Sequence, residues 1–410
     1  MSTRKRQETQ PTSAVALAAR SEIRARVHAE MREAALALVQ GLFLEEVEQL
    51  CGAPFSRKAE GAHYRGGSDP GSVILQGQRI GVKKARVKRL GKDVELKSYA
   101  ALQGFDLLQE RVLRHMMSGV STRQYDGLLE AVAGGLGLKK SSVSKAFIRG
   151  SKQALDAING RDLSDPQWAV VMIDGIEFAG ACVIAALGIT IQGRKLILGL
   201  KRGDTENSEV CKDLLQALIE RGLKPDQPLL FVLDGSKALQ KAVRKVFGPG
   251  TPIQRCIRHK ERNVLGYLSK GNHAEFRRRW KLIHGMTHHS AAEEELKRLG
   301  AWLSQRNLEA AESLKEAGGE TLTVIALGAS GKLRKTLLST NPIESAFSRV
   351  RARTRRVRHW RTRGDQIERW AGTCLLEAEK GFRAIRGAKD LPALMAEIRR
   401  TSLTRHQQAA

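Results

Sequence analysis

The sequence predicts a multidomain α/β protein in which a mixed sheet flanked by helices carries an all-helical insertion and follows a helical N-terminal region with a small β element. Three observations favour this class. A chain of 410 residues is too long for one typical domain. Apolar strand-like runs gather between residues 168 and 233. Helical periodicity dominates on both sides of them.

The N-terminal quarter of the chain combines a helix with strands. Residues 1–20 are polar and rich in Ala, which predicts a disordered tail without the apolar segment of a signal peptide. Residues 21–105 begin with an amphipathic helix, or a helix pair broken near Gly41. Over residues 73–94, Val, Ile and Leu alternate with Lys and Arg, as in a small basic sheet. We therefore expect a helical and β region that binds DNA.

Residues 106–160 return to helical patterning. One expected helix opens at Ser121 and another after Gly137, and the second starts with Ser and Lys residues. Two short helices joined by a turn with Gly are typical of a helix-turn-helix, whose Ser and Lys side chains would face phosphates or base edges. A Ser-capped surface helix is the alternative. The candidate DNA-binding residues here are Arg123, Lys139, Lys140, Ser142 and Lys145.

The pattern over residues 161–265 predicts the first part of the sheet. Strand runs at 168–173, 182–191 and 196–200 precede a helix, and a further buried strand follows at 229–233. A three-stranded antiparallel unit, a helix and another strand have the layout of an RNase H-like core. The remaining expected segments are an all-helical insertion at 266–335, a second part of the core at 336–400 and a tail at 401–410.

Three carboxylates follow this layout. Asp174 and Asp234 each come after an apolar strand run and before Gly, so we expect both at strand ends where they can share divalent metal ions. Glu344 follows Asn341, a candidate helix cap, and Pro342 in a first helical turn. Singly, each acid is explained by turn or cap chemistry. Together, in strand, strand and helix order, they predict a three-acid site for phosphoryl transfer.

The overall charge indicates a class of binding partner, and the cysteines indicate a cellular compartment. A formal net charge of +27 favours a polyanionic partner, and nucleic acid is the first candidate. The five cysteines are odd in number and widely spaced, which argues against a disulfide framework and for a reducing cytoplasm. No apolar run approaches the roughly 20 residues that a membrane helix needs.

Several motifs follow one another along the chain. They are Ile173-Asp174-Gly175, residues 198–200 with Glu206 after them, residues 221–224, Leu233-Asp234-Gly235, residues 254–260, Arg262-Asn263 and residues 340–345. In this order they resemble the Mutator-type transposases of bacterial insertion sequences, and the resemblance covers nearly the whole chain. The segments at 121–123 and 137–145 are also similar to that family's N-terminal DNA-binding region.

The resemblance implies a DDE transposase. Its RNase H-like domain would have a helical insertion between the second Asp and the Glu, and 110 positions separate Asp234 from Glu344 here. Asp174, Asp234 and Glu344 would bind Mg²⁺, or Mn²⁺ in its place. The partners implied are double-stranded DNA, as terminal inverted repeats and target, and further copies of the chain in a homodimer or larger oligomer. The implied location is the bacterial cytoplasm, associated with the nucleoid.

Cys256 and His259 have two interpretations. They have the spacing of half a zinc site, and His284 with His288 offers another pair at helical spacing. The resemblance implies instead a pair that organises the site beside Asp234, without zinc.

The densest basic run follows Glu344, with no acid between Ser345 and Gly364. The guanidinium group of arginine presents its N–H donors in a planar fork that suits phosphate oxygens. Trp360 could stack on an unpaired base. Arg351 lies two helical turns after Glu344, on the same face. A nonspecific nucleic-acid arm is the alternative. The DNA-binding candidates here are Arg349, Arg351, Arg353, Arg355, Arg356, Arg358 and Trp360.

Two other functions use parts of this pattern. A DNA-binding regulator with a repurposed RNase H-like domain would not need three acids. A junction-resolving nuclease would need neither the long N-terminal region nor the large insertion.

Overall fold

The computed structural model divides into two compact units, 1–150 and 151–410, and each is considered by itself. It describes residues 14–55, 63–75, 78–103, 113–114, 116–117, 140–203, 208–316, 318–355, 357, 359–361 and 363–409. No helix among these residues has the length and apolar character of a membrane span. The five cysteines are buried, and none of them forms a disulfide bond.

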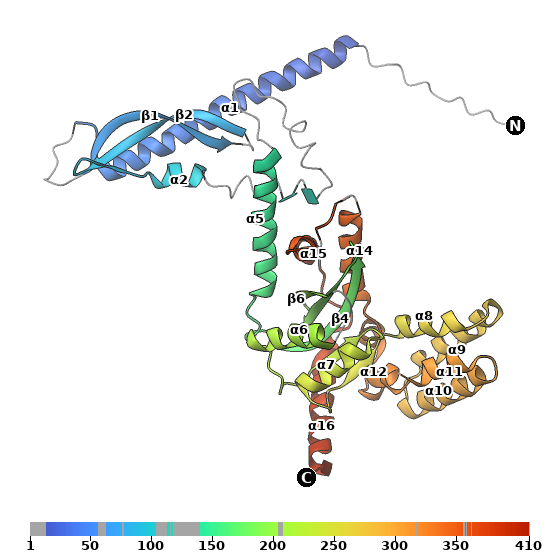
Figure 1. Ribbon diagram of the computed structural model, residues 1–410. Coiled ribbons are helices and arrows are strands. Elements are labelled where there is room, and N and C mark those ends of the chain that lie inside the picture. Colours follow the sequence, from blue (N-terminus) through green and yellow to red (C-terminus); the bar gives the residue numbers. More distant parts are fainter. Residues whose placement is uncertain are drawn as a thin grey trace. The chain divides into compact units, whose positions relative to one another are not determined.

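In the first unit, a long helix packs on a small antiparallel sheet (Figure 1). Val39, Phe43 and Val47 of the helix are buried against strand residues such as Val73 and Val87. The Glu46 carboxylate accepts bonds from the first two amides of α2, which closes the unit around that core. The elements are α1 (Ala14–Cys51), β1 (Tyr64–Leu75), β2 (Gln78–Arg89), β3 (Lys92–Val94) and α2 (Lys97–Gln103).

Helix α1 differs from the sequence expectation in two ways. It begins at Ala14, inside the segment expected to be disordered, because the Ala-rich start favours helix. It also continues past Gly41 without a break. A glycine there costs about 1 kcal/mol, which the buried Val39 and Phe43 on either side can offset.

The second unit is built on a five-stranded mixed sheet with the order β6-β5-β4-β7-β8. The first three strands in sequence are antiparallel neighbours, whereas β7 and β8 run parallel to β4 and to each other. This agrees with the mixed sheet that the sequence predicts. The strands are β4 (Trp168–Phe178), β5 (Ala181–Thr190), β6 (Lys195–Gly203), β7 (Leu230–Leu233) and β8 (Ile253–Arg255).

Helices cover both faces of this sheet, which is why β5 is buried along its whole length (Figure 1). Buried residues of α6 (Ser208–Glu220) and α7 (Lys237–Phe247) join the core on one face. On the other face, α14 (Asn341–Thr354) contacts β4, and α15 (Gln366–Glu379) contacts β5 and β6. Arg161 forms a two-pronged ion pair with Glu379 of α15, at 2.9 and 2.7 Å.

Between β8 and α14 lies a helical region with its own apolar core (Figure 1). Phe276, Trp280 and Leu299 are among its buried residues. The helices are α8 (Ile257–Tyr267), α9 (His273–Gly285), α10 (His289–Ser304), α11 (Leu308–Lys315), α12 (Thr323–Ala326) and α13 (Gly331–Leu337), with short 3₁₀ turns η1 (Lys270–Asn272) and η2 (Gly319–Leu322). After α15, η3 (Ala388–Asp390) leads into α16 (Leu391–Ala409).

The other DNA-binding region that the sequence predicts falls largely outside the described residues. Arg123 and Lys139 lie there, as do residues 118–139 in general. Helix α5 (Lys140–Asn159) begins close to the expected start of the second helix of the helix-turn-helix.

Candidate functional site

Asp174 and Asp234 follow the ends of one parallel strand ladder. β4 and β7 pair from Val170 with Leu230 to Ile173 with Leu233, and the next residue on each strand is the aspartate. Since neighbouring strands lie about 4.8 Å apart, the two carboxylates leave the sheet side by side. β4 itself continues to Phe178, paired with β5, so the expectation that Asp174 ends its strand is wrong. Only the pairing with β7 ends there.

Both aspartates are held by backbone amides. Oδ1 of Asp174 accepts a bond from the Gly175 N–H, and Oδ1 of Asp234 accepts one from the Ser236 N–H, each at 2.9 Å. Asp174 is only 3% exposed, and its Oδ2 has no hydrogen-bond partner among the described residues. Burial, followed by the charge of Asp234, raises the pKa of Asp174 to about 7. Burial also raises the pKa of Asp234.

Glu344 reaches the same neighbourhood from the first turn of α14. Its negative charge, like that of Asp234, raises the pKa of the Asp174 carboxyl. The sequence suggests Asn341 as the helix cap, but the capping residue is Thr340. Pro342 lies in the first turn, as expected. Pro342 has no amide hydrogen to leave unpaired there, so the chain can begin the helix immediately after the cap.

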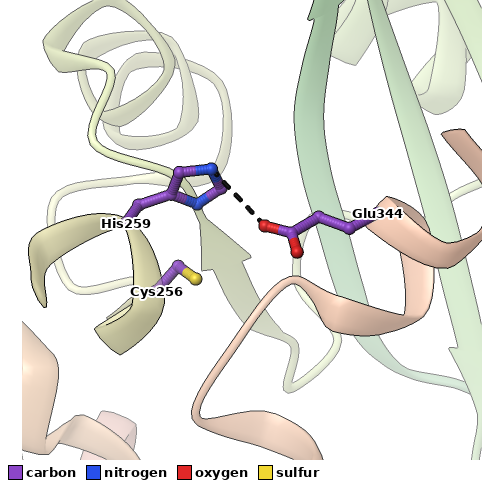
Figure 2. Close-up of side chains that lie close together, drawn as sticks. All are labelled: Cys256, His259 and Glu344. Atoms are coloured by element: carbon purple, nitrogen blue, oxygen red, sulfur yellow. Dashed lines mark ion pairs between the residues drawn. The ribbon is translucent and has the colours of Figure 1, made fainter. Parts of the chain in front are cut away.

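Cys256 and His259 meet Glu344 at the start of α8 (Figure 2). The Cys256 amide donates to the Leu233 carbonyl at 2.7 Å, which ties this segment to the strand before Asp234. Nε2 of His259 lies 3.4 Å from Oε1 of Glu344. Potential metal-ligand atoms of Cys256, His259 and Glu344 all lie within 4.8 Å of one another. In the described part of the chain, this is the cluster of three or more His, Cys, Asp or Glu residues that comes so close together.

The Thr340 hydroxyl joins the three groups. It lies 3.4 Å from the Cys256 sulfur, 3.5 Å from Nδ1 of His259 and 3.3 Å from Oε1 of Glu344. Burial alone would raise the pKa of Cys256, but hydrogen bonds from His259 and Thr340 lower it. The bond to Cys256 raises the pKa of His259 to about 9, and the nearby acids contribute to this shift. The raised pKa favours the protonated form of His259 beside Glu344.

The four-ligand zinc set is not assembled. His284 is buried in α9, where its Nδ1 lies 2.8 Å from the Trp280 carbonyl oxygen and its ring contacts the Trp280 ring. His288 is the residue before α10. Neither belongs to the close group around Cys256.

The arginine run is not one continuous helix, because α14 ends at Thr354. Arg349 is exposed but its guanidinium reaches α15, and Arg353 is half-buried. Nη1 of Arg349 donates to the Ala378 carbonyl at 3.4 Å. Burial raises the pKa of the Cys374 thiol to about 12, and the charge of Arg353 opposes that rise. Arg351 and Arg355 are exposed, whereas Arg356 and Arg358 lie outside the described residues.

Trp360 packs against protein. Its ring makes edge contacts with Phe178 at the end of β4 and with Trp370 of α15, at centroid distances of 5.6 and 6.0 Å. The residue is half-buried by these contacts, and stacking of its ring on an unpaired base stays a prediction. Among the other DNA-binding candidates, Lys145 is exposed on α5. Lys140 and Ser142 belong to the same helix, but the structure does not describe their side chains. Glu206 also lies outside it.

Two residues of this neighbourhood escaped the sequence analysis as separate candidates. The sequence gives little indication of the role of Thr340 in the site, because a Thr before Asn-Pro is typical of an ordinary helix start. Arg255 adjoins Cys256 in the motif but is 1% exposed, and a basic residue in a basic chain gives no sign of burial.

Comparison with known proteins agrees with these features. The family described as "Transposase, Mutator family" matches residues 7–384. The transposase for insertion sequence element IS6120 of Mycolicibacterium smegmatis is 30% identical over 58% of this chain and 74% of its own length. The transposase for IS256 of Staphylococcus aureus is 29% identical over 61% and 65%, and that for ISRM5 of Rhizobium meliloti is 28% identical over 80% and 82%. The chain belongs to the Mutator family of transposases.

Proposed function

We propose that this protein is the transposase of a bacterial insertion sequence, which binds the terminal inverted repeats and catalyses metal-dependent DNA cleavage and strand transfer. The observation that carries the proposal is the gathering of Asp174, Asp234 and Glu344 at the end of the β4–β7 ladder in a Mutator-family chain. Three antiparallel strands followed by two parallel ones, with helices on both faces, support an RNase H-like core.

The acids fit a divalent cation. Oδ2 of Asp174 is buried without a hydrogen bond, and the pKa of about 7 reflects burial beside another carboxyl. A cation between the carboxylates would supply the missing partner and the missing charge. Asp174, Asp234 and Glu344 are the residues that would hold Mg²⁺ or Mn²⁺. Such ions activate an attacking oxygen and stabilise charge on a transferring phosphate.

The chain's own groups position these acids. The amides of Gly175 and Ser236 each occupy one oxygen of an aspartate and leave the other for a ligand. His259 and Thr340 contact one oxygen of Glu344 and so set the direction of its carboxylate. Cys256 in turn holds Thr340 through the amide and the hydroxyl. We assign Cys256 and His259 to organising the site.

DNA contacts are proposed at exposed cations. Arg351 lies seven residues after Glu344, about 10 Å along the helix on the same face, and is suited to a phosphate near the metals. Arg355 is one turn further and Lys145 is on α5. The N-terminal region would read the repeats, and two repeats in one complex call for a homodimer or larger oligomer.

The proposal is tested with purified full-length protein and linear DNA that carries the element's own ends. With Mg²⁺ or Mn²⁺ and without ATP, we expect cleavage at the ends and joining to a target, and none after chelation with EDTA. DNA with scrambled ends is the control. Nicking of both substrates alike would indicate a nuclease of another kind, and end binding without any cleavage would indicate a regulator.

The hydroxyl of Thr340 gives a sharper test of the organised site. Thr340→Val keeps the shape of this fully buried side chain but removes its contacts to Cys256, His259 and Glu344. We expect single-turnover cleavage to fall roughly 10- to 100-fold, as for other groups that orient metal ligands. Thr340→Ser keeps the hydroxyl and should stay within a few-fold of wild type. Equal rates for the two variants would show that the hydroxyl has no such role.

A further inference from the structure

Arg255, at the end of β8, is the largest fully buried side chain that the structure describes, with 1% of its surface exposed. A buried guanidinium needs charged and hydrogen-bonding partners, because removal from water strongly disfavours an isolated charge. Its Nη2 donates to the Gly235 carbonyl at 2.8 Å and to Oε1 of Glu316 at 3.3 Å. Its Nη1 lies 3.6 Å from Oε2 of Glu320.

These partners come from two parts of the fold. Gly235 directly follows Asp234 on the loop between β7 and α7. Glu316 follows α11 and Glu320 is in η2, so both belong to the helical region between β8 and α14. Arg255 is thus the direct polar link from that region to the backbone beside Asp234.

Further contacts fix the two glutamates. Lys260, 2% exposed, donates to Glu316 at 2.8 Å and to the Ser313 carbonyl at 2.7 Å. Arg244 of α7 pairs with Glu320 at 2.6 Å. Both carboxylates are therefore held in place beside Arg255, Glu316 as a hydrogen-bond acceptor and Glu320 as an ion-pair partner.

Gly235 itself is closely confined. A Cβ at this position would lie 3.3 Å from Nδ2 of Asn263 and 3.8 Å from Nη2 of Arg255. Asn263 of α8 and Arg255 thus both lie close to the loop that carries Asp234, and the guanidinium also acts on Asp234 as a nearby positive charge. The absence of a side chain at Gly235 lets both neighbours approach the backbone.

We propose that Arg255 is a positioning residue through which the helical insertion, by Glu316 and Glu320, holds Asp234 in place for metal binding. The insertion then sets the metal affinity of the site in addition to any contact it makes with DNA. The inference rests on the proposed function, because it takes Asp234 as a metal ligand.

The test measures Mn²⁺ binding to the full-length protein without DNA, by electron paramagnetic resonance of free Mn²⁺. Arg255→Lys keeps the charge but cannot bridge Gly235 and the two glutamates as a planar fork. We expect Mn²⁺ affinity to fall roughly tenfold or more, with end-DNA affinity unchanged and cleavage restored at high Mn²⁺. Glu316→Gln, at a half-buried position, should weaken Mn²⁺ binding in the same direction even if Arg255→Lys fails to fold.

Arg161→Lys is the matched control, since it makes the same exchange at a half-buried guanidinium that links a backbone carbonyl, that of Ile197, to a carboxylate, that of Glu379. It should bind Mn²⁺ within about twofold of wild type. Normal Mn²⁺ affinity in Arg255→Lys and Glu316→Gln, with only a lower melting temperature, would make the network merely structural and overturn the inference. If Asp234→Asn binds Mn²⁺ as well as wild type does, the metal site itself is wrong, and both proposals fail.

Discussion

Replacing any one of the three acids should abolish DNA cleavage and leave DNA binding intact. For Asp174→Asn, Asp234→Asn and Glu344→Gln we expect single-turnover cleavage to drop roughly 10³-fold or more. The amide keeps the shape of the carboxylate but lacks the charge that a divalent cation requires. Affinity for end DNA should stay within about threefold, because the phosphate contacts are made by other side chains.

Exposed acids supply the controls for this set. Asp213→Asn on α6 and Glu309→Gln on α11 change the same charge by the same chemistry, away from the β4–β7 ladder. Both should cleave like wild type. A variant of the three site acids that retains normal cleavage would remove that residue from the site, and a parallel loss of DNA affinity would point to a folding defect.

Acidification should weaken the helical insertion through His284. Burial lowers the pKa of His284 to about 4, whereas an unfolded histidine titrates near 6.5. Above pH 6.5 both states are neutral and the group has no effect. Between pH 6.5 and 4 the unfolded chain binds a proton that the folded one excludes, so the free energy of unfolding falls with pH, by about 3 kcal/mol in all.

Hydrogen exchange of the α9 and α10 amides, corrected for intrinsic rates, measures this effect in the full-length protein. Between pH 7.5 and 5.0 the opening free energy of these helices should fall by about 2 kcal/mol. His284→Leu removes the titrating group and should flatten that part of the dependence. An equal fall in the variant would assign the acid sensitivity to other groups.

The sequence predicted the sheet well where its pattern was long. The ten residues of β5 are all buried, and such a long apolar run beside the Gln192-Gly193 turn is typical of a strand that ends in a hairpin. The sequence therefore predicted these strands and the turn between them. β8 was missed because three residues carry no periodicity, and its place follows from pairing with β7. The end of α14 at Thr354, within the arginine run, could not be predicted, since charge density does not show where a helix ends.

The candidate site could be predicted only as a set of residue types. Strand ends and a helix start suggested Asp174, Asp234 and Glu344, but no spacing shows that Glu344 approaches His259. Contacts such as Thr340 to Cys256 join residues 84 positions apart and exist only after folding. Likewise, the contacts that Arg349 and Trp360 make with α15 could not be predicted from the sequence, because they depend on where α15 packs.

The order of elements along the chain also matters during synthesis. The last strand of the sheet ends at Arg255, but α14, which covers one face of it, begins only at Asn341. At about 5–20 residues per second, roughly 4 to 17 s pass between the two on the ribosome. The nascent protein therefore exposes an apolar sheet face while the insertion is being made, which is a state prone to aggregation. Under the proposed function it also lacks one of its three metal ligands, Glu344, until α14 is made.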